Sequence, residues 1–153
     1  MSLSTIFISS GFNNELLKFW NTPKITTLEG HTQVVFSVTV SGKYIISGSL
    51  DNTIKIWDLS TSKLVTTLEG HNGYVMSVAV SGIINTAKFP DNIGKQYIIS
   101  GSEDKTIKIW DFSTFKLIKS LESHTNSVKS VAVSDKYIIS GSEDNTIKIW
   151  EKN

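Results

Sequence analysis

Serine, histidine and aspartate recur together three times along this chain. The three sets are Ser47 with His31 and Asp51, Ser100 with His71 and Asp104, and Ser140 with His124 and Asp144. These side-chain types form the catalytic group of many hydrolases, in which a histidine base activates a serine hydroxyl for attack on a carbonyl carbon. The first question is therefore whether any of these sets is a nucleophilic active site.

The sequence around the serines does not favour catalysis. A nucleophilic serine needs a sharp turn and a nearby oxyanion hole, and the pattern Gly-x-Ser-x-Gly that builds such a turn does not occur here. One active site also needs only one constellation, whereas this chain repeats the same constellation three times. We therefore predict that the chain is not an enzyme and has no catalytic residues.

The three sets belong to a repeat of 40 residues. The histidines lie 40 and then 53 residues apart, and the aspartates lie 53 and then 40 residues apart. An aspartate precedes Trp57, Trp110 or Trp150 by 6 residues in each copy. The 13 extra residues of the second copy must therefore lie between His71 and Asp104, and we assign them to the segment 82–96.

Each copy of the repeat has the pattern of four β-strands. In the first copy we expect strands at 34–40, 44–49, 53–59 and 63–69, which are rich in Val, Ile, Thr and aromatic residues and separated by turn residues. The alternation in "TIKIW" is typical of a half-buried strand, with its lysine on the solvated side. That lysine is Lys55, Lys108 or Lys148. Short connections between strands predict antiparallel sheets and an all-β fold.

The residues before His31 resemble a degenerate, partial copy of the repeat. Trp20 stands 11 residues before His31, and Ser10 and Asn14 fall where later copies have serine and aspartate. The last copy has no fourth strand, because the sequence ends at "WEKN". We therefore predict one domain, 1–153, with about 3.5–4 units. These are a partial unit at 7–30 and repeats at 31–70, 71–123 and 124–153.

The pattern "LEGH…VxSVxV…YIISGSxDxTIKIWD" resembles the WD-repeat β-propeller family, with its Gly-His, Ser-Gly-Ser-x-Asp and Trp-Asp signatures. The resemblance covers residues 26–153 well and 7–25 weakly. It implies blades of four antiparallel strands arranged around a central channel.

The resemblance also gives the repeated polar residues a structural role. It implies that the His, Ser, Asp and Trp of each blade form one buried hydrogen-bond network, and their donors and acceptors can satisfy one another. The residues assigned to these networks are His31, Ser47, Asp51, Trp57, His71, Ser100, Asp104, Trp110, His124, Ser140, Asp144 and Trp150.

Positions at which the near-identical copies differ are our candidates for partner binding. They lie three and five residues after the histidine and one residue before the aspartate, and the resemblance places them near one face of the propeller and the channel mouth. Aromatic residues and methionine are enriched in interface cores. Ordinary drift at tolerant surface positions is the alternative. The candidates are Val34, Phe36, Leu50, Tyr74, Met76, Glu103, Ser127, Lys129 and Glu143, with Phe89 from the segment 82–96.

Composition narrows the choice of partners and cofactors. The chain has 15 Lys and Arg against 14 Asp and Glu, without a run of like charges, so we predict neither a nucleic-acid nor a membrane partner. It has no cysteine, and its three histidines belong to different repeats, so we predict no metal and no cofactor. No signal peptide or apolar span is evident, and we expect a cytoplasmic protein, with the nucleus as the alternative.

These observations favour a non-catalytic scaffold that binds proteins or peptides. The alternatives are a small-ligand or enzymatic propeller that uses its central channel, and an incomplete fragment of a longer WD-repeat protein. A blade face without a neighbouring blade, and a strand edge without a partner strand, favour association with another protein chain. We expect a homodimer that shares one propeller ring, and the alternatives are a closed four-bladed monomer and a fragment of a longer gene product.

Overall fold

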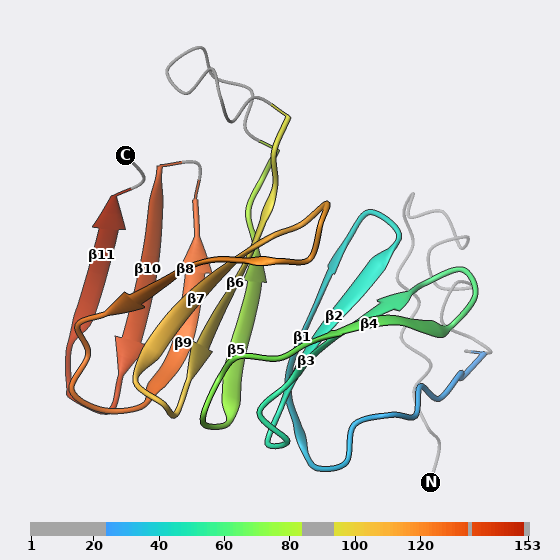
Figure 1. The fold of residues 1–153 in the computed structure, drawn as a ribbon, viewed down its shortest axis with the longest axis horizontal. Coiled ribbons are helices and arrows are strands. Elements are labelled where there is room, and N and C mark those ends of the chain that lie inside the picture. The colour runs from blue at the N-terminus through green and yellow to red at the C-terminus, as the bar shows by residue number, and fades with distance from the viewer. Residues whose placement is uncertain (1–23, 84–93, 135, 152–153) are drawn as a thin grey trace, which may run out of the picture.

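The computed structural model describes residues 24–83, 94–134 and 136–151, and within them the regular elements are β-strands in three antiparallel sheets. Blade 1 contains β1 (Val35–Ser41), β2 (Tyr44–Ser49), β3 (Ile54–Asp58) and β4 (Lys63–Leu68). Blade 2 contains β5 (Val75–Val80), β6 (Tyr97–Ser102), β7 (Thr106–Asp111) and β8 (Leu117–Glu122). Blade 3 contains β9 (Val128–Val133), β10 (Tyr137–Ser142) and β11 (Ile147–Glu151). The blades stand side by side, with blade 2 in the middle (Figure 1).

Each blade is an antiparallel meander, because strands that follow one another in the sequence are neighbours in the sheet. The turn between the second and third strands places Asn52, Lys105 or Asn145 at a φ of 67°, 71° or 64°. This left-handed region is uncommon for residues other than glycine and most accessible to Asn and Asp. Lys105 adopts the same conformation in blade 2, so the surrounding turn, and not the residue type alone, sets it.

Successive blades pack through the first strand of the later blade. We call this strand, which is β1, β5 or β9, the innermost strand. Strand β5 lies on β1 and β2, and β9 lies on β5 and β6. The core between blades 1 and 2 joins Ile46, Ile54 and Ile56 to Val75 and Val78. Burying such aliphatic side chains supplies about 1.5–3 kcal/mol each. The hydrophobic core of this protein therefore lies between the sheets.

Two glycines allow this close approach of one blade to the next. A Cβ added at Gly48 would lie 2.6 Å from Cγ1 of Val75, and one added at Gly101 would lie 2.7 Å from Cγ1 of Val128. A serine hydroxyl then links the same pairs of blades. Ser37 Oγ accepts a hydrogen bond from the backbone N–H of Val78 at 3.1 Å. In blade 2, Ser77 Oγ accepts one from Val131 at 3.1 Å.

The all-β fold of antiparallel blades predicted from the sequence is confirmed. Blade 3 has three strands in the described residues, and the segment 82–96 begins after β5 and ends before β6. Most of the partial unit 7–30 and the candidate Phe89 lie outside the described residues. Residues 24–30 form no strand, although "KITTLEG" closely matches β4.

The prediction that the repeated lysine faces solvent is wrong for Lys108. This residue is 9% exposed, and its Nζ donates a hydrogen bond to Ser120 Oγ at 2.7 Å. The equivalent Lys55 Nζ donates to Thr67 Oγ1 at 2.9 Å. An outer strand supplies the acceptor in both blades, so the lysine lies along the sheet instead of extending into water.

Candidate functional site

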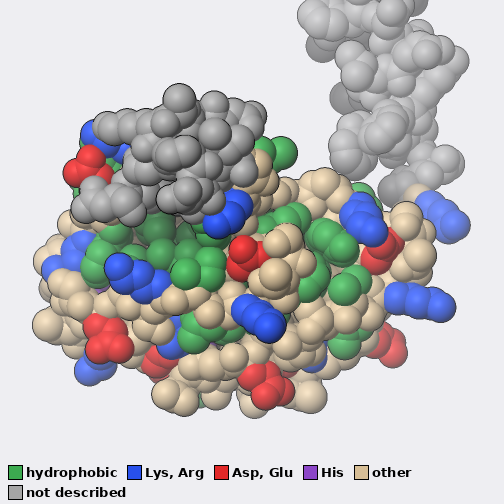
Figure 2. All heavy atoms as spheres, turned by 45° about the horizontal axis from the view of Figure 1, so that its top comes forward, with side chains coloured by type: hydrophobic (Ala, Val, Ile, Leu, Met, Phe, Trp, Pro, Cys, Tyr) green, Lys and Arg blue, Asp and Glu red, His purple; other side chains and the backbone are tan. Residues whose placement is uncertain are grey.

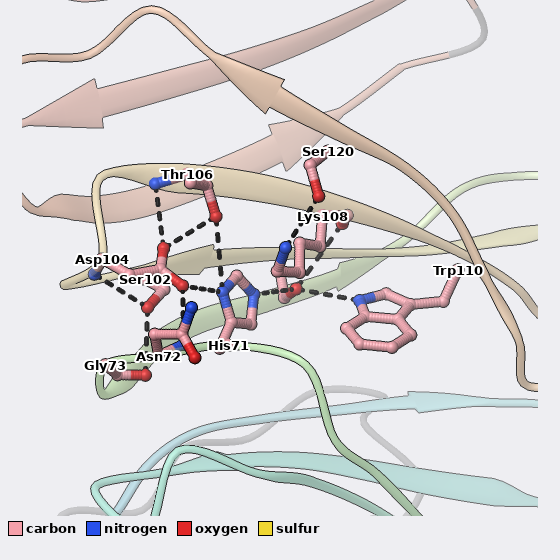
Figure 3. A network of polar contacts seen from close by, with 10 residues as sticks. His71, Asn72, Gly73, Ser102, Asp104, Thr106, Lys108, Trp110 and Ser120 are labelled. Carbon is pink, nitrogen blue, oxygen red and sulfur yellow. Dashed lines mark hydrogen bonds and ion pairs between the residues drawn. The ribbon is translucent and has the colours of Figure 1, made fainter.

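The polar residues of blade 2 form one continuous chain of hydrogen bonds (Figure 3). His71 lies in the loop from β4 to β5, Ser100 on β6 and Trp110 on β7. Trp110 Nε1 donates to Ser100 Oγ at 3.0 Å, and Ser100 Oγ lies 2.8 Å from His71 Nε2. On the other side of the ring, His71 Nδ1 lies 2.7 Å from Asp104 Oδ2. The network thus ties the entry loop of the blade to three successive parts of its sheet.

Blades 1 and 3 repeat this geometry. In blade 1 the His–Asp, His–Ser and Trp–Ser distances are 2.8, 2.7 and 2.9 Å. In blade 3 they are 2.6, 2.8 and 2.9 Å. The structure therefore brings together, blade by blade, the four side chains that the sequence analysis grouped in each copy.

The distances indicate where the protons lie. The indole N–H can only donate, so Ser100 Oγ accepts from Trp110 and has one hydrogen of its own to give. Its two acceptors are His71 Nε2 at 2.8 Å and the carbonyl of Lys108 at 3.5 Å. The shorter contact indicates that the serine donates to Nε2, which leaves the imidazole proton on Nδ1 to be donated to Asp104.

Threonine and backbone groups complete the network at the aspartate. Thr106 donates to Asp104 Oδ1 from its hydroxyl at 2.7 Å and its N–H at 3.0 Å, and the N–H of Asn72 donates to Oδ2 at 3.0 Å. The hydroxyl of Ser102 accepts from the N–H of Asp104 at 3.0 Å and donates to the carbonyl of Gly73 at 3.0 Å.

The sequence analysis did not assign these threonines and second serines to the network. Their signal was present, because "SGSxDxT" repeats both of them in every copy. The residues added by the structure are Ser49, Thr53, Ser102, Thr106, Ser142 and Thr146.

The hydrogen bonds stabilise the charged form of each network aspartate. Burial of Asp104 favours its protonated form, but hydrogen bonds from His71 and Thr106 outweigh that effect and hold its pKa well below the ordinary value. Asp51 has the same balance, with Thr53 and His31 as the main donors, and its pKa is also lowered. At Asp144 the hydrogen bond from Thr146 is the largest cause of the lowered pKa.

We expect the folded state to lose stability as the pH falls below the ordinary carboxyl pKa of 3.8. A carboxylate with a lowered pKa in the folded state binds protons more readily when unfolded, so its stabilisation is present above pH 3.8 and is lost on further acidification. Urea unfolding at a series of pH values, followed by far-UV circular dichroism, measures this. The Asp104→Asn variant should show a shallower dependence, and equal slopes for both proteins would contradict the assignment.

The contacts from Ser to His and from His to Asp match those of a hydrolytic triad, but the serine cannot reach a substrate. Ser47, Ser100 and Ser140 are 3%, 0% and 1% exposed. Each Oγ also accepts a hydrogen bond from an indole N–H, so the tryptophan ring lies against the hydroxyl. A nucleophile must lie within reach of a bound carbonyl carbon. Each set is therefore a buried hydrogen-bond network, with its serine hydroxyl inside the blade.

The three histidines belong to three different blades, so they do not come together as ligands of one metal ion. Among the residues that the structure describes, no group of three or more His, Cys, Asp or Glu side chains is arranged to hold a metal ion. Nor does that part of the chain contain a helix long and apolar enough to cross a membrane.

The candidate partner-binding residues gather at the end of each blade where the innermost strand begins. The residue before the network aspartate donates its N–H to the carbonyl of the residue three after the histidine. These pairs are Leu50 to Val34 at 2.9 Å, Glu103 to Tyr74 at 2.9 Å, and Glu143 to Ser127 at 3.0 Å. The structure therefore places two of the three variable positions side by side in every blade.

The accessibility of these candidates differs. Val34, Phe36 and Tyr74 are 58%, 44% and 39% exposed. Met76 and Leu50 are half-buried, Ser127 is buried and Glu103 is exposed. In blade 3, Lys129 Nζ lies 2.9 Å from Glu143 Oε1, and this ion pair lowers the pKa of Glu143. At this end, blade 1 thus presents apolar side chains, blade 2 an aromatic residue beside an acid, and blade 3 a salt bridge.

Comparison with known proteins supports the assignment of the repeats. Coatomer subunit beta'-1 of Arabidopsis thaliana is 35% identical over 107 residues, which are 68% of this chain and 11% of that protein. Autophagy-related protein 16 of Arabidopsis thaliana is 30% identical over 71% of this chain and 19% of its own length. Cell division control protein 4 of Candida albicans is 36% identical over 72% of this chain and 15% of its own length. The chain thus spans less than a fifth of the length of these relatives.

The fold is shared with the solved structure of U3-55K, at a TM-score of 0.69 and 23% identity, over 81% of this chain and 36% of that one. The family model "WD domain, G-beta repeat" matches residues 22–58, 62–111 and 115–151. These matches cover most of the sequence and include every described blade. The chain therefore belongs to the WD-repeat family.

Proposed function

We propose that this protein is a non-catalytic scaffold that binds proteins or peptides at the end of its blades where the innermost strands begin. The observation that carries the proposal is a division of roles within each repeat. The residues capable of chemistry are identical in every copy and buried in a structural network, as the 0% exposure of Ser100 illustrates. The residues that differ between copies include the exposed side chains of Val34, Phe36 and Tyr74.

Family membership supports an interaction role. The coatomer relative is named as a subunit, which is a component of a larger assembly. Fold alone does not determine function. The support specific to this chain comes from its exposed side chains at Val34, Phe36 and Tyr74, together with Glu103, which we call the platform. The mixture of aromatic, aliphatic and acidic groups there is typical of protein interfaces, in which an apolar centre is surrounded by polar groups.

The charges of this protein fit protein partners better than polyanions. Lys and acidic side chains are interspersed among hydrophobic ones on the face shown in Figure 2. The near-equal numbers of basic and acidic residues leave a net charge of +1, which gives little long-range attraction to nucleic acid or an anionic membrane. The proposed scaffold is a cytoplasmic homodimer in which two copies share one ring of blades.

We expect Tyr74→Ala to weaken partner binding about tenfold or more, because an exposed aromatic beside the acidic Glu103 has the character of an interface hot spot. A peptide selected from a displayed random library against the folded chain serves as the probe, and calorimetry measures its affinity for each variant. Leu117→Ala is the matched control, since Leu117 is 44% exposed on the outer strand β8. Equal affinity for both variants would contradict the proposed platform.

The non-catalytic part of the proposal has its own test. We expect no turnover of ester, amide or phosphoester model substrates that depends on a network serine. Hydrolysis by the purified chain that disappears in Ser100→Ala, with an unchanged circular dichroism spectrum, would overturn the scaffold proposal.

A further inference from the structure

The face of blade 1 that points away from blade 2 exposes valines whose equivalents in the other two blades are buried. Val38 on β1 is 67% exposed, whereas the equivalent Val78 and Val131 are 6% and 7% exposed. Val35 is 45% exposed, and its equivalents Val75 and Val128 are fully buried. These buried counterparts are the side chains that pack against the preceding blade.

The opposite end of the molecule lacks the matching partner. Ile147 and Ile149 on β11 are 74% and 69% exposed, whereas the equivalent Ile54 and Ile56 of blade 1 are fully buried. A Cβ added at Gly141 would meet nothing within 4 Å, although valines lie against the equivalent glycines of blades 1 and 2. Blade 3 therefore exposes the surface that is equivalent to the one covered by β5 in blade 1 and by β9 in blade 2.

A third feature links the two ends. Residues 24–29, "KITTLE", match the outer strand of blade 1, "LVTTLE" at 64–69, but are in no strand. Ile25 is 84% exposed. In blades 1 and 2 the outermost strand and the innermost strand of the next blade are consecutive in the sequence. Residues 24–40 thus have the sequence of a segment that completes one blade and begins the next.

We propose that residues 24–40 of one copy dock on blade 3 of a second copy. Residues 24–29 become the fourth strand beside β11, and β1 covers the surface around Gly141. The inference rests on the homodimer in the proposed function and specifies how it is built. A second copy is the occupant because the docked surface has already been formed twice within the chain, between blades 1 and 2 and between blades 2 and 3.

The internal repeats set the register of this contact. Ile56 pairs with Thr66 in blade 1, so Ile149 should pair with Thr26 of the second copy. Lys148 Nζ should donate to Thr27 Oγ1, as Lys55 does to Thr67. Ser130 lies on β9 at the position of Ser37 and Ser77, and its Oγ should accept the N–H of Val38 from the second copy.

The docking is head-to-tail, because two different surfaces meet. Blades 1 and 3 lie at opposite ends of one copy, so neither can satisfy the other within that copy (Figure 1). Such a contact either closes a ring or continues as a fibre. Propellers typically have 4–8 blades. Two copies supply six described blades, which lies in that range.

Light scattering after size exclusion tests the association. We expect a species of about twice 16.9 kDa for the 153-residue chain. Val38→Glu should reduce this mass to that of one chain, since it places a charge in the docked face, and the 67% exposure of Val38 lets a single copy tolerate it. Leu64→Glu is the matched control on β4, where Leu64 is 44% exposed, and should keep the dimer. A wild-type monomer, or equal effects of both changes, overturns the proposal.

Disulfide trapping tests the register independently of these variants. The chain has no cysteine, so an engineered pair is the only source of a crosslink. A mixture of Thr26→Cys and Ile149→Cys chains should oxidise to a covalent dimer, because opposed residues of antiparallel strands have Cα atoms about 4.5–5.5 Å apart. The pair of Ile25→Cys and Ile149→Cys, one residue out of register, should crosslink much less. Equal crosslinking of both pairs, or of neither, overturns the proposal.

These results separate the docking from the proposed platform. A monomer that keeps Tyr74-dependent peptide binding contradicts the docking alone. A trapped dimer whose peptide binding does not depend on Tyr74 contradicts the platform and supports the docking.

Discussion

Trp110→Ala is expected to lower the free energy of unfolding by about 3–5 kcal/mol. The indole is 2% exposed and lies in the core between blades 1 and 2. A Cβ at Gly70 would be 3.2 Å from its Cη2 atom, so the entry loop rests directly on the ring. The substitution therefore leaves a cavity under that loop and also removes the N–H that Ser100 accepts.

Urea unfolding at matched protein concentration, followed by far-UV circular dichroism, measures this loss. Trp150→Ala is the matched control, because Trp150 makes the same hydrogen bond in blade 3 but is only partly buried. We expect a clearly smaller loss there, since less packed surface is removed. Equal losses at the two positions would show that the network hydrogen bond, and not burial in the central blade, dominates.

Asp104→Ala is expected to lower the free energy of unfolding by about 3 kcal/mol. Its carboxylate accepts hydrogen bonds from His71, Asn72 and Thr106. Alanine removes this acceptor, so these donors lose their partner. A buried donor that loses its partner costs about 1–3 kcal/mol. The side chain of His71 is 1% exposed, so water cannot readily replace the lost acceptor there.

The same urea titration measures the effect of Asp104→Ala, with Glu103→Ala as its control. Glu103 is the neighbouring residue and is exposed, so its loss should change the stability by less than about 0.5 kcal/mol. Comparable losses for the two variants would contradict a network role for Asp104. The alanine variant should also show a weaker dependence of stability on acid, because one of the carboxylates with a lowered pKa is gone.

Much of the fold was predictable because the same sequence pattern occurs three times in the chain. The 40-residue period, the alternation in "TIKIW" and the recurring turn residues predicted the four strands of blade 1 at 34–40, 44–49, 53–59 and 63–69. The structure has them at Val35–Ser41, Tyr44–Ser49, Ile54–Asp58 and Lys63–Leu68. Strand alternation and hairpin turns are local properties, and local residues specify them.

The polar network was predictable in its members but not in its full extent. The repeated His, Ser, Asp and Trp marked its centre, whereas the roles of Thr106 and Ser102 depend on the shape of the turn that holds Asp104. The burial of Lys108 depends on Ser120, which a neighbouring strand brings to its ammonium group. Thr106 and Ser102 are only two residues from Asp104, but their bonds to it require the backbone conformation of that turn. Lys108 and Ser120 lie on different strands, and only the pairing of those strands brings them together.

What the sequence by itself determined is the unit: its strands, its turns and the composition of its network. What only the tertiary structure decided is which copies of that unit are buried. The motif "VxSVxV" has nearly the same residues in every copy, yet Val78 and Val131 are buried and Val38 is exposed. Residues 24–29 closely match β4 and still form no strand. Burial and strand pairing are relations between a segment and its neighbour. Nearly identical segments therefore differ where one packs on a preceding blade and the other has none among the described residues.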